Sequence, residues 1–134
     1  MRQQPVSAAS GLSDAWHTLG FEWSQKTPNV VYVTAGVQGI TNIFDLAFNA
    51  DGQVVDNLKT ASAQTEYGQW STRRFAMSWG EFLSVANAKE VKMRVSRAND
   101  YTVSSFGPAH PNALVNTKLA PFVAKVRDLR ASAK

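Results

Sequence analysis

The sequence predicts an α+β fold in which an antiparallel β-sheet is packed on one face by a C-terminal amphipathic helix. Two segments, 30–58 and 70–106, alternate apolar and polar residues at period two, with turn residues between the runs, as strands do. Near the C-terminus apolar residues recur every three or four positions, which indicates a helix. At 134 residues the chain is expected to form a single domain over residues 13–134, preceded by a flexible polar lead over residues 1–12.

The first elements after the lead are expected to be short. Ser13 and Asp14 can cap a helical turn over Ala15–Leu19, because their side-chain oxygens accept from free backbone N–H groups, and Gly20 can end it. Phe21–Trp23 alternates apolar and polar residues and predicts a short strand.

Residues 30–58 are predicted to form an antiparallel meander of three strands. Val30–Val37 is rich in β-branched residues and gives the strongest strand signal, and Ile40–Asn49 follows after a turn at Gln38–Gly39. Asp51–Gly52 favours the positive φ angles of a hairpin turn, so Gln53–Leu58 is expected to return as the third strand.

The next segment combines strands with a capped helix. Residues 59–68 are polar, lack periodicity and predict a loop, and Trp70–Met77 alternates as a strand. Ser78 and Glu81 match a capping box, in which each side chain accepts from the backbone N–H of the other residue, so a short helix is expected near residues 79–87. Two further strands are then expected, at Glu90–Ser96 and Tyr101–Phe106.

The C-terminal helix follows a loop over Gly107–Pro111. Its apolar stripe consists of Val115, Leu119, Phe122, Val126 and Leu129. Pro121 interrupts this stripe. A proline is tolerated in the first position of a helix, so we expect one separate turn and then a helix that begins at Pro121; a longer helix kinked there is the alternative.

The composition excludes several kinds of site. Cysteine is absent, which excludes disulfides, thiolate catalysis and cysteine-based zinc sites. The two histidines, His17 and His110, lie far apart in the sequence and have no ligand spacing, so we expect no metal and no cofactor. No apolar run approaches the ~20 residues that a membrane-spanning helix needs. We find no catalytic motif; a pocket around His110, Glu66 and Tyr67 would be needed for the alternative of a small hydrolase or isomerase.

The positive charge is concentrated in the second half of the chain. Residues 51–134 carry twelve basic and seven acidic side chains, and six of the fourteen Lys/Arg fall within residues 70–106. If the apolar residues of these strands face the helix, the opposite face presents a basic row. This row is expected to contain Thr72, Arg74, Lys92, Arg94, Thr102 and Ser104, with Trp70 beside Arg74. The row is a candidate binding surface for an anionic partner; the alternative is a solvated sheet face that keeps the protein soluble.

Two stretches carry a resemblance to a known class of proteins. RFAMSWGEFLSVANAKEVKMRV and LAPFVAKVRDL resemble, in their pattern, small bacterial envelope lipoproteins whose folded part is a sheet backed by a C-terminal helix. The lead MRQQPVSAAS has no apolar core for a signal peptide and fits the tether that follows a lipidated cysteine, with Met1 standing in the place of that cysteine. An ordinary N-terminus of a cytosolic protein is the alternative.

These observations favour a non-enzymatic binding module that is periplasmic or tethered to the bacterial envelope. It would meet a protein or another anionic envelope component through one sheet face or through the 59–68 loop. The binding residues expected are Trp70, Arg74, Lys92 and Arg94. The same residues would serve the alternative function, a small cytosolic nucleic-acid-binding domain, by phosphate contacts and base stacking.

Overall fold

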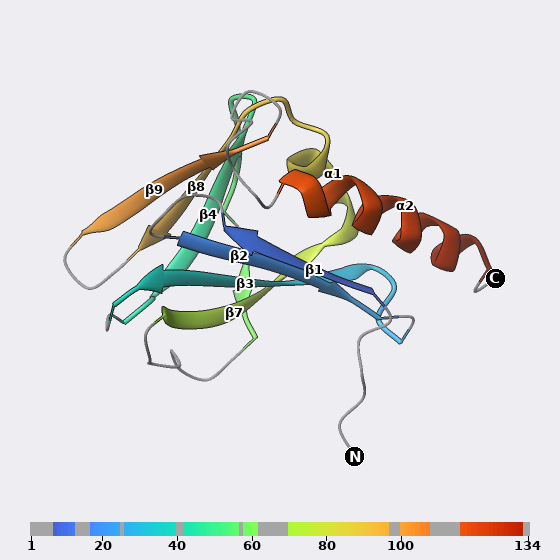
Figure 1. Cartoon of the computed structure of the whole chain (residues 1–134), viewed down its shortest axis with the longest axis horizontal. Helices are drawn as coiled ribbons and strands as arrows, with labels where there is room; N and C mark the ends of the chain where they lie inside the picture. The colour runs from blue at the N-terminus through green and yellow to red at the C-terminus, as the bar shows by residue number, and fades with distance from the viewer. Residues whose placement is uncertain are drawn as a thin grey trace, which may run out of the picture.

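The computed structural model describes residues 7–12, 17–24, 26–39, 42–56, 58–61, 70–96, 100–107 and 116–132. They form two antiparallel sheets and two helices, which confirms the predicted α+β class with its short capped helix and C-terminal helix. Figure 1 shows the two sheets crossing at an angle, with α2 running along one side of the molecule.

The first sheet has five strands in the order β1-β2-β3-β7-β6. Its strands are β1 (Ser7–Leu12), β2 (His17–Trp23), β3 (Val30–Gln38), β7 (Trp70–Ser78) and β6 (Lys59–Thr60). The second sheet has four strands in the order β5-β4-β8-β9. Its strands are β5 (Gln53–Val55), β4 (Asp45–Ala50), β8 (Val91–Ser96) and β9 (Tyr101–Phe106).

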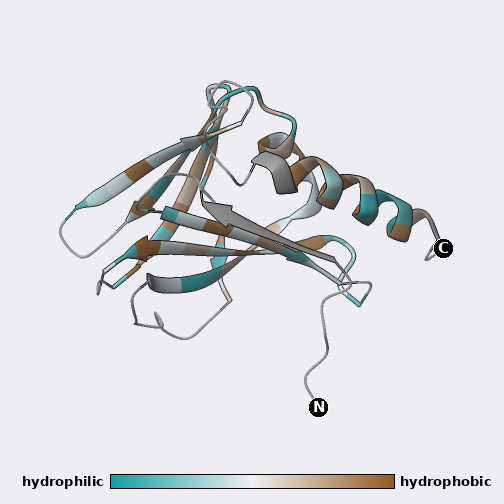
Figure 2. Ribbon diagram, in the orientation of Figure 1, coloured by the Kyte–Doolittle hydropathy of each residue, from teal (hydrophilic) through white to brown (hydrophobic). Residues whose placement is uncertain are grey.

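The core lies between the inner faces of the two sheets and under the helices. Alternate residues of β2, β3 and β8 are buried, as the period-two patterns predict, and the hydropathy colours of Figure 2 change along these strands accordingly. Buried side chains from both sheets and both helices belong to one hydrophobic cluster. The described residues therefore share a single core.

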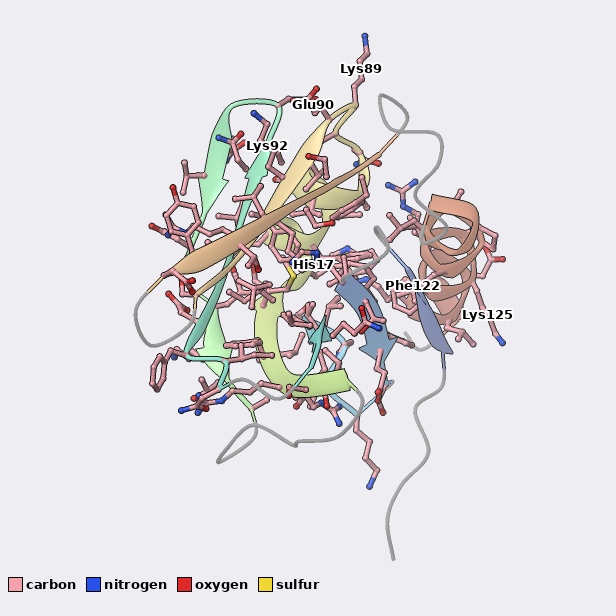
Figure 3. The ribbon with its side chains drawn as sticks, turned by 60° about the vertical axis from the view of Figure 1, so that its left-hand side comes forward. His17, Lys89, Glu90, Lys92, Phe122 and Lys125 are labelled. Atoms are coloured by element: carbon pink, nitrogen blue, oxygen red, sulfur yellow. The ribbon has the colours of Figure 1, made fainter. Side chains whose placement is uncertain are left out.

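Two helices close one end of this core. α1 (Trp79–Ala86) begins at the predicted capping box: the Ser78 hydroxyl accepts from the N–H of Glu81, and the Glu81 carboxylate accepts from the N–H of Ser78. Three rings join the elements, with centroid separations of 5.2 Å for Phe21–Phe82 and 5.5 Å for Phe82–Phe122. Figure 3 shows Phe122 of α2 pointing toward the strands and Lys125 pointing away from them.

Two expectations for the helical segments are wrong. Residues 17–23 form the strand β2 rather than ending a helical turn, because His17, Leu19 and the apolar residues after them bury one face at period two. α2 spans Asn116–Ser132, so Pro121 lies inside the helix and does not begin it. Of the expected stripe, Leu119, Phe122 and Val126 are buried and Leu129 is partly buried, whereas Val115 lies outside the described residues.

The predicted meander over residues 30–58 is divided between the two sheets. β3 pairs with β2 and β7, whereas β4 pairs with β5 and β8, so Gln38–Gly39 leads from one sheet to the other instead of forming a hairpin. Side chains of β7 hold this crossover: the Ser71 hydroxyl donates to the Gly39 carbonyl at 2.6 Å, and the Arg73 guanidinium donates to the Ile43 carbonyl at 2.8 Å. The strand expected at residues 53–58 ends at Val55, and Lys59–Thr60, expected in a loop, pairs with β7.

Candidate functional site

The outer face of the four-stranded sheet presents basic and apolar side chains together. Lys92 and Arg94 of β8 point outward, because Val91, Met93 and Val95 between and beside them are buried. The register places Lys92 opposite Ser105 of β9, and Arg94 opposite Val103. We call five exposed side chains of this face, Val54, Lys92, Arg94, Tyr101 and Val103, the outer patch; the exposed Asn49 of β4 lies between Val54 and Lys92 on the same face.

Three members of the outer patch are large and apolar. Val54, Tyr101 and Val103 are 61%, 62% and 47% exposed, and they are three of the four large hydrophobic side chains that are exposed in the described part of the chain. Tyr101 and Val103 belong to β9, the edge strand next to the basic strand β8, whereas Val54 belongs to β5, the opposite edge strand, with β4 between it and β8. Concentration of exposed apolar area on one face is more informative than scattered exposure, since such patches mark interaction sites.

The two cations of the outer patch form no ion pair with any described residue. No carboxylate of the described residues lies within ion-pair distance of Lys92 or Arg94. The Arg94 guanidinium lies over the Tyr101 ring, 5.9 Å from its centroid, which is the outer limit of a cation–π contact. The positive charge of both side chains is therefore directed to solvent and available to an anionic partner.

Arg74 does not join Lys92 and Arg94, and the basic row expected from the sequence does not form. Arg74 lies on β7 of the other sheet, where its guanidinium is 3.4 Å from the Glu22 carboxylate and 4.3 Å from the centroid of the Tyr32 ring. The single row was predicted because β7 and β8 were assigned to one sheet, whereas α1 separates them and sends the chain into the second sheet. The backbone of Trp70 belongs to β7, but its side chain lies outside the described residues.

Two other members of the expected row lie on the inner face. Thr102 and Ser104 have the same parity in β9 as the fully buried Phe106, and Ser104 is 2% exposed. The Thr102 hydroxyl is 2.9 Å from Nε2 of the buried His17, which Figure 3 shows between the sheets. The expectation placed them outside because the strand 101–106 contains apolar residues of both parities, so its pattern alone does not fix the buried face.

The remaining candidate residues are either structural or outside the described ranges. His110, Glu66 and Tyr67 lie in segments that are not described, so the structure does not test the pocket expected there. Trp23 is fully buried and donates its indole N–H to the Pro28 carbonyl at 3.0 Å. Trp79 packs on Phe82, with ring centroids 5.5 Å apart. Both tryptophans are therefore packing residues.

A cleft of about 360 Å³ lies between α1, α2 and the end of β9. Its described lining is mainly apolar, including Val85, Phe106 and Leu119, and Arg127 is the one charged side chain in that lining. A small-molecule site usually adds several convergent polar groups to such a lining, which favours the outer patch as the candidate site. No group of three or more His, Asp or Glu side chains that could hold a metal ion occurs among the described residues.

The sequence identified Lys92 and Arg94 but missed Val54, Tyr101 and Val103. The outward direction of Lys92 and Arg94 follows from their alternation with buried residues on β8, whereas β5 and β9 become edge strands only through the sheet order. In the described residues no helix is both long enough and apolar enough to cross a membrane. Comparisons of the chain with protein-family models, with curated proteins and with solved structures found no match.

Proposed function

We propose that this chain is a non-enzymatic binding module that engages an acidic protein segment through the outer patch. The observation that carries the proposal is the joint exposure, on one sheet face, of Lys92 and Arg94 and of three large apolar side chains. Neither cation has a carboxylate partner among the described residues.

The combination of exposed cations and exposed apolar side chains is better explained by a protein partner than by a role in solubility alone. Burial of apolar surface contributes about 25 cal/mol per Å², so covering Val54, Tyr101 and Val103 would supply affinity without any charge. Arg94 adds a planar guanidinium that can bind a carboxylate with two parallel hydrogen bonds. A face that served only solubility would not need exposed valines beside its cations.

The location in the bacterial envelope remains part of this proposal. Its support is the polar lead over residues 1–12 and the pattern resemblance of the second half of the chain to envelope lipoproteins. Binding of single-stranded nucleic acid is the second candidate function. One observation favours it: Tyr101 is 62% exposed beside the Arg94 guanidinium, an arrangement on which a base can stack.

The experiment compares two double variants that remove equal charge. Lys92→Gln/Arg94→Gln removes the cations of the outer patch, and Lys26→Gln/Lys125→Gln removes two exposed cations elsewhere. Fluorescent poly-L-glutamate and a twelve-residue oligothymidylate are titrated with each protein, at low and at physiological ionic strength. We expect the outer-patch variant to bind poly-L-glutamate about tenfold more weakly, and the matched control to bind like the wild type.

Two outcomes would contradict the proposal. If both double variants bound poly-L-glutamate equally weakly, binding would depend only on the net charge of the protein and not on the outer patch. Tight binding of the oligothymidylate that is lost in Tyr101→Ala, with no binding of poly-L-glutamate, would favour the nucleic-acid function instead.

A further inference from the structure

Among the described strands, β9 forms one edge of the four-stranded sheet. It pairs with β8 on one side, and no other described strand pairs with it. The other sheet edges are different: β5 has three residues, β6 has two, and α2 packs against β1. β9 has six residues, YTVSSF, and contains no charged residue and no proline. Charged residues and prolines normally protect an edge strand from pairing, so β9 lacks this protection.

One hydrogen bond fixes which backbone groups of β8 point toward which neighbour. The N–H of Asp51 donates to the carbonyl of Glu90 at 3.0 Å, and this pair continues the register of β4 with β8. In an antiparallel ladder, hydrogen-bonded pairs alternate with non-hydrogen-bonded pairs. The backbone groups of Lys92 and Arg94 are therefore directed to β4, and those of Met93 and Val95 to β9.

The backbone groups of β9 alternate in the same way. Thr102, Ser104 and Phe106 are opposite Val95, Met93 and Val91, so their N–H and C=O groups are directed to β8. Those of Tyr101, Val103 and Ser105 are directed to the open edge. Among the described residues these three have no hydrogen-bond partner on that side. Their side chains lie on the outer face, so the open backbone groups and the outer patch belong to the same residues.

We propose that the acidic partner binds as an added antiparallel strand along β9, with its acidic side chains on the outer face. This inference rests on the proposed function and specifies how the same surface is used. Free N–H and C=O groups in a row require an extended backbone as their partner, and antiparallel pairing is the more stable arrangement. A partner residue opposite Val103 would lie two strands from Arg94, about 10 Å away, within the combined reach of an arginine and a glutamate side chain.

Charge favours an acidic segment over a second copy of this chain. Pairing of β9 with β9 of another copy would place a second Lys92 and a second Arg94 on the same face, and would neutralise neither. Glutamates opposite Tyr101, Val103 and Ser105 would instead be drawn toward these cations. The added strand would also cover Val103, which is 47% exposed.

The test uses a capped seven-residue peptide that alternates glutamate and threonine, and two N-methylated forms of it. In the antiparallel register the residue opposite Val103 directs its own N–H to β9, so the glutamate amides face the edge and the threonine amides face solvent. Methylation of the glutamate amides is expected to weaken binding about tenfold or more, and methylation of the threonine amides to leave it unchanged. The two forms have the same amino-acid sequence and charge, and they differ by one methyl group.

A protein variant tests the edge from the other side. Val103→Pro removes one edge N–H without touching the ladder with β8, because a proline is compatible with an edge position whose N–H faces solvent. Val103→Pro is expected to bind the unmethylated peptide about tenfold more weakly than the wild type does. Val103→Thr keeps the N–H and should bind the peptide like the wild type. The experiment with the methylated peptides uses the wild-type protein, so it remains decisive even if Val103→Pro folds poorly.

The outcomes separate this inference from the proposed function. Equal binding of both methylated peptides, or binding of poly-L-glutamate but not of the alternating peptide, overturns strand addition and leaves the outer patch as the binding surface. Greater loss on threonine methylation overturns the antiparallel register. A dimer that sediments as such and is abolished by Val103→Pro assigns the edge to a second copy. Failure of every acidic probe at low salt contradicts the proposed function itself.

Discussion

Asp51 joins two segments of the four-stranded sheet through its carboxylate. Asp51 has a φ of +52° and Gly52 a φ of +92°, so the pair forms the tight turn between β4 and β5 that Asp-Gly predicts. The carboxylate accepts from the N–H of Glu90 at 2.9 Å and from the N–H of Lys89 at 3.0 Å. It therefore fixes the start of β8, the strand that carries both cations of the outer patch.

These contacts make stability depend on pH in a defined direction. The backbone N–H of Glu90, then that of Lys89, and the positive charge of Lys89 hold the pKa of the Asp51 carboxyl below its ordinary value. Because the pKa is lower in the folded state, the stabilisation is fully present above the unfolded value of about 4 and is lost as pH falls through the folded value.

We predict that Asp51→Asn unfolds at lower denaturant concentration than the wild type at pH 7, and that the difference shrinks as pH falls toward 3. Asparagine keeps the turn, since it also tolerates positive φ, but cannot ionise. Urea unfolding, followed by tryptophan fluorescence at several pH values, measures the difference at pH 7 and its dependence on pH. Asp56→Asn is the control, because Asp56 is exposed and forms no hydrogen bond among the described residues. A difference independent of pH would show that the charge of Asp51 contributes nothing.

At the scale of elements, α2 contains a local defect at Pro121. The helix begins at Asn116, so Pro121 is its sixth residue and cannot donate to the carbonyl four residues earlier, at Thr117. The apolar stripe of Leu119, Phe122 and Val126 is nevertheless buried on both sides of the proline. Burial of this stripe therefore outweighs the cost of the missing hydrogen bond.

We predict that Pro121→Ala raises the free energy of unfolding by about 1–3 kcal/mol, because alanine restores the N–H and proline is disfavoured inside helices. Pro121 is exposed, so the change creates no cavity. Ala124→Gly, at an exposed position of the same helix, should lower stability by about 1 kcal/mol and serves as a check of sensitivity. Unchanged stability of Pro121→Ala would indicate that the helix starts at the proline, where it costs little.

Local signals in the sequence predicted the elements better than their connections. The capping box at Ser78 and the alternation in β3 and β8 depend on neighbouring residues, and each is confirmed. The capping signals before Ala15–Leu19 were outweighed by burial of His17 and Leu19 on the sheet. The crossover at Gly39 depends on Ser71, which is 32 residues away and hydrogen-bonds to it. No local pattern reports such a contact.

The same limit applies to the candidate site. The outward direction of Lys92 and Arg94 follows from alternation alone, but their separation from Arg74 follows from the division into two sheets. The importance of Tyr101 and Val103 follows from β9 being an edge strand, which is a property of the sheet order. The basic residues could be predicted from the sequence, and their apolar neighbours could not.

At the scale of the whole molecule, many cations serve the fold. Arg73 donates to the Ile43 carbonyl, and Arg74 pairs with Glu22. Arg130, near the end of α2, donates to the Pro28 carbonyl and lies over the Trp79 ring, 4.7 Å from its centroid. Lys92 and Arg94 pair with no carboxylate and donate to no carbonyl among the described residues, and the contact of Arg94 with the Tyr101 ring lies within the outer patch itself. The face that carries them lies opposite the packed core. This contrast distinguishes the outer patch from the other basic parts of the molecule.

The most direct test of the outer patch as the binding surface is an amide chemical-shift map of the ¹⁵N-labelled protein titrated with the alternating glutamate–threonine peptide. We expect the largest changes on Lys92, Arg94, Tyr101, Val103 and Ser105, with little change on α2 or around Arg74. Saturating changes centred on the cleft beside Arg127, or on the Arg74–Glu22 pair, would contradict this expectation.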